Sequence, residues 1–245
     1  GKAEQHINIS RMLELSESRQ LTDLAEMPAK RFHGVRIAVA RDAAFSFIYR
    51  DNIRFLEHLG AEIIYFSPIN DEKTPDGING LMLFGGYPEL FAEKLSENRS
   101  MMQSIKEKIK RGLPIIAECG GFMYLHDTLA IDDKHTYPMV GVIPGKAFPT
   151  AKLQRFGYVR LYAKENNLLC NKNEELLAHE FHYWDSENCG SGFKAVKESS
   201  GKQWDCVHAK ENMYAGFPHL YFYANLSAAL RFVEACHKYG DNNDI

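Results

Sequence analysis

Short runs of hydrophobic residues alternate with helix-like patterns through the first half of the chain. Each run has the length of a buried strand, and in the stretches between runs apolar residues recur every three or four positions. The predicted strands are 35–40, 61–66, 80–84 and a run that ends at Cys119, and the predicted helices are 52–59, 89–97 and 101–111. Strands that alternate with helices in this way predict an α/β fold, with a mostly parallel sheet covered by helices on both faces.

The second half of the chain is richer in strand-like alternation. Four strands are predicted there, at 155–163, 177–184, 192–196 and 204–209, and a C-terminal helix is predicted over about 226–239. In a parallel sheet, ligands bind beyond the carboxyl ends of the strands. The ends at Gly85-Gly86 and at Cys119 therefore mark the expected site.

Residues 1–34 differ from the rest of the chain. A short amphipathic helix is predicted there from apolar residues at helical spacing, which are Ile9, Met12, Leu13 and Leu15. Residues 21–25 add a further helical turn and 28–31 form a connector. Because this piece is too short for a core of its own, we interpret 1–34 as a linker or the tail of an absent neighbouring domain. Residues 35–240 then form one domain.

Composition and charge exclude several classes of protein. The chain has 245 residues, a formal net charge of -3 and a pI near 6.4, which gives no reason to expect nucleic acid or an anionic membrane as partner. No apolar stretch approaches the ~18 residues of a membrane-spanning helix. The five cysteines are scattered without a Cys-x-x-Cys pair, so we expect no metal site and a reducing, cytoplasmic setting.

The end of the strand at Cys119 is the strongest candidate for chemistry. Gly120 and Gly121 follow the cysteine, and a helical pattern then starts at once with Phe122–Leu125 and continues to Leu129. A nucleophile between a strand and a helix lies at the helix N-terminus, where the backbone potential is positive. The competing interpretation is a buried structural cysteine, which is the usual state of a free thiol.

A thiol attacks only as the thiolate, so Cys119 needs a base. An unperturbed cysteine is only about 3% ionised at pH 7, and ionising most of it takes about 2.7 kcal/mol. A helix N-terminus supplies about 0.3–1 kcal/mol. The strongest candidate base is His219, which follows a Gly-Phe-Pro turn and precedes a strand-like segment; His179 and His182 are rivals.

The rival histidines lie in His179-Glu180-Phe181-His182-Tyr183. On a strand, His179 and His182 point to opposite faces, which disfavours a metal pair. Glu180 and His182 share a face, and either side chain is suited to line a pocket or to orient His219. Acyl transfer also needs two backbone N–H donors for the oxyanion; Gly120 and Gly86 are the expected donors.

Taken together, the ordered motifs resemble the CobB/CobQ-like class I glutamine amidotransferase domain. They are most similar to the C-terminal glutaminase domains of cobyrinic acid (or hydrogenobyrinic acid) a,c-diamide synthases. The resemblance covers about residues 34–235. It rests on Asp42–Phe47 with Tyr49 and Asp51-Asn52, Leu83–Leu90, Ala117–Gly121, Tyr137–Val142, Leu153–Tyr158, His179–Tyr183 and His219–Phe222.

The resemblance implies a flavodoxin-like sheet and an enzyme that hydrolyses glutamine and passes ammonia to a partner synthetase. It makes Cys119 the nucleophile, His219 its base, and the Gly86 and Gly120 amides the oxyanion hole. In the family, an ATP-dependent N-terminal domain activates the a and c carboxylates of a corrin precursor. No phosphate-binding Gly-x-x-x-x-Gly-Lys-Ser/Thr loop occurs in this sequence. We therefore expect no cofactor in this domain, and ATP and Mg in the absent synthetase domain.

Two departures from the family pattern affect the expected site. Tyr221 stands two positions after His219, where many relatives have an acidic residue, and we expect Glu180 to replace that carboxylate. Met123 stands where many relatives have glutamine. Contacts to the glutamine substrate are therefore expected from Tyr87, Gln154 and Arg155, because a guanidinium suits a carboxylate.

Other functions remain open at this level. The tetrapyrrole is recognised by the absent half, so a nickel-sirohydrochlorin a,c-diamide synthase is an alternative. A glutaminase-like docking module with a decayed site is another, because the acidic partner of His219 is missing. A third is a cysteine hydrolase on a related fold, such as a γ-glutamyl hydrolase or a small peptidase. Self-association as a homodimer also stays open.

Overall fold

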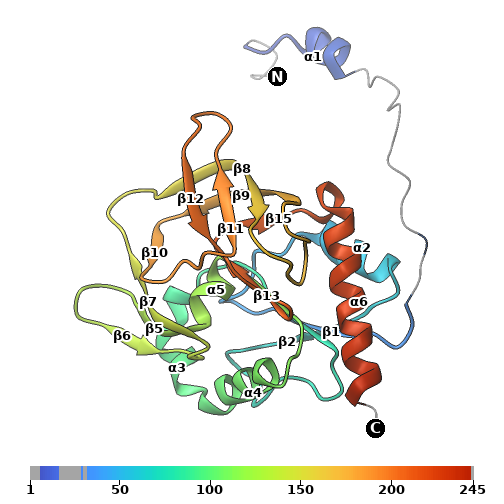
Figure 1. Cartoon of the computed structure of the whole chain (residues 1–245). Coiled ribbons are helices and arrows are strands. Elements are labelled where there is room, and N and C mark those ends of the chain that lie inside the picture. The colour runs from blue at the N-terminus through green and yellow to red at the C-terminus, as the bar shows by residue number, and fades with distance from the viewer. Residues whose placement is uncertain (1–5, 17–28, 30–31, 244–245) are drawn as a thin grey trace.

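A six-stranded sheet forms the centre of the protein (Figure 1). The computed structural model describes residues 6–16, 29 and 32–243. The strand order is β13-β14-β4-β3-β1-β2, in which every neighbouring pair is parallel except β13 and β14. The strands are β1 (Arg36–Ala40), β2 (Glu62–Phe66), β3 (Gly80–Leu83), β4 (Ile115–Glu118), β13 (His208–Lys210) and β14 (Met213–Gly216). The predicted mostly parallel sheet is confirmed.

Two hydrophobic cores lie on the two faces of this sheet. Ile37 and Val39 of β1 belong to one core and Ala38 and Ala40 to the other, because successive side chains of a strand point to opposite faces. Helices α2 (Arg50–His58) and α6 (Leu226–Asn243) pack in the first core. Helices α3 (Ala92–Glu97), α4 (Arg99–Lys110) and α5 (Gly120–Tyr124) pack in the second. The sheet is therefore covered by helices on both faces, as predicted.

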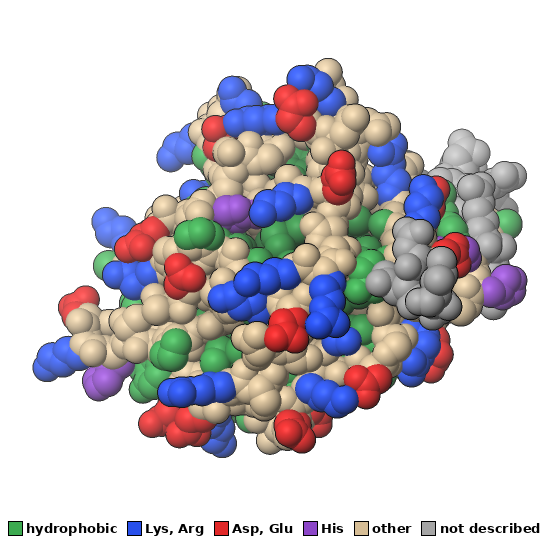
Figure 2. All heavy atoms as spheres, turned by 60° about the horizontal axis from the view of Figure 1, so that its bottom comes forward, with side chains coloured by type: hydrophobic (Ala, Val, Ile, Leu, Met, Phe, Trp, Pro, Cys, Tyr) green, Lys and Arg blue, Asp and Glu red, His purple; other side chains and the backbone are tan. Residues whose placement is uncertain are grey.

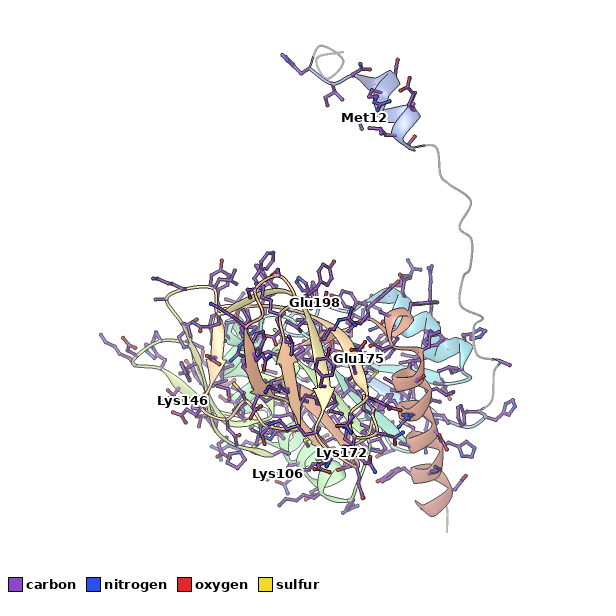
Figure 3. The ribbon with its side chains drawn as sticks, turned by 45° about the horizontal axis from the view of Figure 1, so that its top comes forward. Met12, Lys106, Lys146, Lys172, Glu175 and Glu198 are labelled. Atoms are coloured by element: carbon purple, nitrogen blue, oxygen red, sulfur yellow. The ribbon has the colours of Figure 1, made fainter. Side chains whose placement is uncertain are left out.

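A five-stranded sheet in the order β12-β11-β8-β9-β15 completes the first core. Its strands are β8 (Arg155–Ala163), β9 (Glu175–His182), β11 (Phe193–Val196), β12 (Gln203–Cys206) and β15 (His219–Leu220). All of its pairs are antiparallel, and Arg160 of β8 forms ion pairs with Glu175 and Glu198, which Figure 3 labels. The edge strand β15 brings His219 to the carboxyl end of the central sheet.

A third sheet was not predicted. Its order is β10-β7-β5-β6, with strands β5 (His126–Ala130), β6 (Thr136–Pro138), β7 (Ile143–Pro149) and β10 (Trp184–Ser186). The helix predicted to run from Cys119 through Leu129 is consequently wrong in length. Helix α5 ends at Tyr124, because Thr128, Leu129 and Ala130 pair with neighbouring strands instead.

Two predicted strands are each divided between two sheets. The strand predicted at 177–184 ends at His182, and Trp184 then begins β10 in the third sheet. The strand predicted at 204–209 breaks at Val207, whose positive φ of 66° turns the chain from β12 into β13. A β-branched residue rarely adopts this conformation, so the sequence carried no signal for the break. Two further short helices among the described residues are η2 (Pro88–Phe91) and η3 (Phe222–Ala224).

The amphipathic helix predicted near the N-terminus is present as α1 (Ile9–Ser16). None of its residues is buried, and Figure 3 shows it away from the sheets, with Met12 labelled. The further turn predicted at 21–25 lies outside the described residues, as does nearly all of the connector at 28–31.

Among the helices that the structure describes, none combines the length and hydropathy needed to cross a membrane. The face in Figure 2 carries basic and acidic side chains interspersed, without a large area of one sign. This distribution agrees with the small formal net charge of -3.

Candidate active site

Cys119 lies at a sharp turn between β4 and α5. Strand β4 is buried between β3 and β14, and the Cys119 amide donates to the Gly216 carbonyl at 2.8 Å. The backbone of Cys119 has φ 47° and ψ -105°, a strained conformation for a residue with a side chain. Strain of this kind turns a nucleophile out of the end of a sheet, and the Cys119 side chain is indeed partly exposed.

The two glycines after Cys119 are required by close packing. A Cβ on Gly121 would lie 2.0 Å from the Leu83 carbonyl oxygen, and one on Gly120 would lie 2.8 Å from Pro88 Cδ. Both contacts are too short for any side chain. The turn therefore packs directly on the end of β3 and on the start of η2. Because α5 has only five residues, its dipole contributes little to the ionisation of the thiol.

Strand β15 and helix α2 together hold His219 in place. His219 pairs with His179 of β9 across an antiparallel ladder, and only 5% of its surface is exposed. The buried Asn52 amide of α2 donates to the Leu220 carbonyl at 2.8 Å and accepts from the Phe222 N–H at 2.8 Å. The ring of Phe47 contacts the imidazole edge to face, with centroids 5.1 Å apart.

The side chains of His219 and Cys119 meet above Gly85. A Cβ on Gly85 would lie 2.7 Å from His219 Cε1 and 3.6 Å from Cys119 Cβ, so only glycine leaves room for the imidazole. Burial by itself lowers the pKa of His219, but its interactions with Cys119 and with Glu118 outweigh burial and raise this pKa to about 10. A protonated imidazole beside a cysteine is the partner that activates the thiol as a nucleophile.

The carboxylate beside His219 belongs to Glu118, which was not among the predicted site residues. Glu118 is fully buried at the end of β4, and its Oε1 accepts from the Leu220 N–H at 3.1 Å. Its Oε2 lies 3.4 Å from His219 Nδ1. The two atoms are not aligned as a hydrogen bond, and neither has another partner among the described residues.

Glu180 is not the carboxylate that faces His219, contrary to the prediction. Its Oε2 lies 3.1 Å from His182 Nε2 and 3.9 Å from Arg155 Nε. Alternation along β9 explains the difference, because Glu180 and His182 share the inward face while His179, the partner of His219, lies on the other face. Tyr221 also turns away, since its hydroxyl donates to Asp51 Oδ2 at 3.2 Å.

Neither Arg155 nor Gln154 lines the cavity beside Cys119, although both were predicted to bind substrate. The Arg155 guanidinium lies near Glu180 and 5.3 Å from the centre of the Trp204 ring. Arg155 pairs with His182 in the β8–β9 ladder, and this register directs its charge to the buried Glu180. The Gln154 amide donates to the Lys152 carbonyl at the surface.

The two glycines proposed for the oxyanion hole come close together. The Gly86 nitrogen would lie 3.0 Å from a Cβ on Gly120, so the two residues are immediate neighbours. Gly120 is the first residue of α5, and the first N–H groups of a helix have no partner within it. Among the described residues, the Gly86 N–H donates to no acceptor either. Two N–H donors are therefore available next to Cys119.

A cavity of about 260 Å³ opens in front of Cys119 and His219. Its lining is mainly aromatic and includes Tyr87, one of the residues expected to contact the substrate. Met123 lines it as well. The other lining residues are Phe47, Gly86, Glu89, His179, Phe181, His182, Tyr183 and Trp184.

The sequence contained a signal for Glu118 that the prediction missed. A carboxylate at the end of an otherwise apolar, buried strand is costly unless it has a partner. Glu118 follows Ile115–Ala117 directly, and this position beside the nucleophile marks it as a functional residue.

Within the described chain, no group of three or more His, Cys, Asp and Glu side chains is arranged to hold a metal ion.

The fold matches that of known glutamine amidotransferases. A chain in the structure of PurLQS from Thermotoga maritima aligns with a TM-score of 0.58 and 18% identity, over 84% of this chain and 98% of its own length. A solved glutamine amidotransferase aligns with a TM-score of 0.54 and 14% identity, over 84% and 98%. At these identities the match establishes the class I amidotransferase fold alone.

Sequence comparison identifies the family. Cobyrinate a,c-diamide synthase of Caldanaerobacter subterraneus is 41% identical over 208 residues, which cover 84% of this chain and 46% of the relative. The synthase of Thermoplasma volcanium is 37% identical over 246 residues, which cover 98% and 53%. The chain thus spans about half the length of these relatives. Residues 36–226 match the CobB/CobQ-like glutamine amidotransferase domain, and the chain belongs to this family.

Proposed function

We propose that this domain hydrolyses glutamine through a thioester on Cys119 and releases ammonia for an amidation reaction. The observation that carries the proposal is the meeting of Cys119 and His219 above Gly85, at the mouth of a small cavity. The thiolate attacks the side-chain amide carbon of glutamine. The oxyanion that forms is stabilised by the N–H groups of Gly86 and Gly120.

As this intermediate collapses, the His219 imidazolium protonates the former amide nitrogen, the carbon–nitrogen bond breaks, and ammonia leaves. His219 then acts as a base for the water that attacks the thioester, which yields glutamate and regenerates the thiol. Glu118 stabilises the imidazolium and orients its ring in both steps. Because its Oε2 lies 3.4 Å from His219 Nδ1, Glu118 is better placed for this role than Glu180, to which it was first assigned.

The test of this proposal is glutamine turnover by the Cys119→Ser variant. Wild-type protein should convert glutamine to glutamate and ammonia in equal amounts, and Cys119→Ser should lose at least about a thousandfold in kcat. Cys189→Ser is the matched control, because it also exchanges a partly buried thiol but lies outside the cavity. Turnover that survives in Cys119→Ser would remove the proposed nucleophile.

The acceptor of the ammonia is proposed to be cobyrinic acid or hydrogenobyrinic acid, amidated at its a and c carboxylates. The names of the two relatives favour this substrate over nickel-sirohydrochlorin. The amidation would require ATP and Mg in a synthetase domain, whereas the glutaminase chemistry described above uses only residues of this chain. Free thiols at all five cysteines suit a reducing, cytoplasmic setting.

Exposed aromatic side chains support a synthetase partner at the mouth of the cavity. Phe156 and Tyr158 of β8 are exposed, and their rings contact Phe181 and His179, which line the cavity. Continuous exposed aromatic surface is typical of an interaction site. The uncovered apolar residues of α1 are consistent with residues 1–34 being a connection to that partner.

A further inference from the structure

Glu89 is the one acidic residue among those that line the cavity. It stands in the first turn of η2, directly after Pro88, which packs against the start of α5. This packing places the Glu89 side chain beside the turn that carries Cys119. The remaining lining consists mainly of aromatic rings, together with the reactive groups already described.

The Glu89 carboxylate has no partner among the described residues. No ion pair or side-chain hydrogen bond joins it to another group there, although the side chain is only partly exposed. Burial raises the pKa of Glu89 to about 6, opposed only in part by its own backbone N–H. A partly buried carboxylate without a cation is unfavourable, and such groups cluster at ligand sites.

We propose that Glu89 binds the α-ammonium group of the glutamine substrate. This inference rests on the proposed function and names the residue that recognises the amino-acid end of the substrate. A cation that enters the cavity would supply the missing partner of the carboxylate, in a mainly apolar environment where a charge-assisted hydrogen bond is strong. Specificity then follows, because a carboxamide without an ammonium group leaves Glu89 unpaired.

Ligand binding in a Cys119→Ala background tests this inference without turnover. Two ligands are compared by calorimetry: L-glutamine and glutaramate, which has the same carboxamide and carboxylate but no ammonium group. With Glu89 intact, glutamine should bind at least about 30-fold more tightly than glutaramate. With Glu89→Gln added, glutamine affinity should fall to within about threefold of glutaramate affinity, which itself should hardly change.

Glu93→Gln is the matched control. Glu93 lies four residues further on, in α3, is exposed and does not line the cavity. This variant removes the same charge and should keep the preference for glutamine. A Glu89→Gln variant that keeps the preference, or that weakens both ligands equally, would overturn the inference.

The pH dependence of binding gives a second readout. Glutamine affinity should fall as the pH drops through about 6, because protonated Glu89 no longer attracts the ammonium group. Cys119 is absent from the variant background, but His179, His182, His219, Tyr87 and Tyr183 also line the cavity. A charge on any of these groups would also act on the ammonium group, so the pH dependence of the affinity ratio is compared with and without Glu89→Gln, and the part that is lost in the variant belongs to Glu89. A ratio that stays constant between pH 5 and pH 8 would contradict the inference. Failure of wild-type turnover would instead overturn the proposed glutaminase activity. The binding assay uses the Cys119→Ala background and requires no turnover, so the two failures are distinguishable.

Discussion

At the scale of single residues, the site depends on two groups that flank the reacting pair. Gly85 leaves the space in which the His219 imidazole reaches Cys119, and Glu118 Oε2 lies 3.4 Å from Nδ1 of the same ring. Glu118 is the last residue of β4, and Gly85 follows the end of the neighbouring strand β3. The charge of Glu118 helps to raise the pKa of His219, against the effect of burial.

Replacing Glu118 by glutamine tests its role. Glu118→Gln keeps an oxygen for the Leu220 N–H but removes the charge that stabilises the imidazolium. We expect kcat for glutamine to fall about 100-fold with KM little changed, because the charge matters mainly when the imidazole is protonated. Steady-state kinetics of purified variants measures this.

Glu180→Gln is the informative comparison. Glu180 is equally buried, but it contacts His182 and Arg155 rather than His219. Its loss should lower the midpoint of thermal unfolding, and it should lower kcat less than Glu118→Gln does. A larger kcat loss in Glu180→Gln than in Glu118→Gln would restore the assignment first made from the sequence.

These residues also show how far the sequence could predict the site. The sequence could predict four site residues because each stands where a buried strand ends: Gly86, Tyr87, Cys119 and Gly120. Glu118 was overlooked, although a carboxylate that ends a buried apolar strand directly before the nucleophile is itself a signal. Arg155 was misplaced because the strand pattern gave its strand but not the register with β9, which directs its side chain to Glu180.

At the scale of elements, the position of His219 is set by a strand of two residues. Strand β15 has one ladder neighbour, β9, and Asn52 of α2 binds the Leu220 carbonyl and the Phe222 N–H, on either side of Tyr221. A short edge strand has little stability of its own. The alignment of base and nucleophile therefore relies on Asn52.

The Asn52→Ala variant should lose both stability and activity. It leaves the Leu220 carbonyl and the Phe222 N–H unpaired in the core, which costs about 2–3 kcal/mol of unfolding free energy. It also frees β15, so kcat should fall at least about tenfold. Chemical denaturation and glutamine turnover measure the two effects.

Asn225→Ala controls for the loss of stability. Asn225 forms a similar pair of backbone hydrogen bonds to Leu177 in β9 and a third to the Tyr221 carbonyl, and it does not line the cavity. It should lose similar stability and keep most of its kcat. Equal kcat losses in the two variants would contradict a positioning role for Asn52.

The elements themselves were predictable where the hydrophobic pattern was regular. The central strands and the long strand β8 follow from buried runs and from alternation. The third sheet was missed because its strands are short and contain proline at positions 138, 144 and 149, which weakens the strand signal. The short α5 was overestimated because an apolar segment at helical spacing continued into β5.

At the scale of the whole molecule, the reactive cavity opens on a surface rich in exposed aromatic rings. Tyr158 is 80% exposed although it stands in the middle of β8, and it contacts His179 at the edge of the cavity. Since the chain spans about half the length of its relatives, we expect the other half of such proteins to cover this surface.

Tyr158→Ser should separate glutamine turnover from stimulation by a synthetase partner. Glutamine turnover by the domain alone should stay within about twofold of wild type, because Tyr158 does not line the cavity. Stimulation by the added synthetase portion of the Thermoplasma volcanium relative should fall at least about tenfold. Tyr162→Ser, on the same strand and face but farther from the cavity, should keep the stimulation. Equal stimulation of both variants would contradict docking at this surface.

The most direct test of the account is covalent trapping of the thiol by an electrophilic glutamine analogue. Wild-type protein is treated with 6-diazo-5-oxo-L-norleucine, and the modified residue and the rate are determined by mass spectrometry. We expect one adduct per chain, on Cys119, whose formation glutamine prevents and which forms at least about 100-fold more slowly in His219→Asn. An adduct on another residue, or an equal rate in His219→Asn, would contradict a cysteine activated by His219.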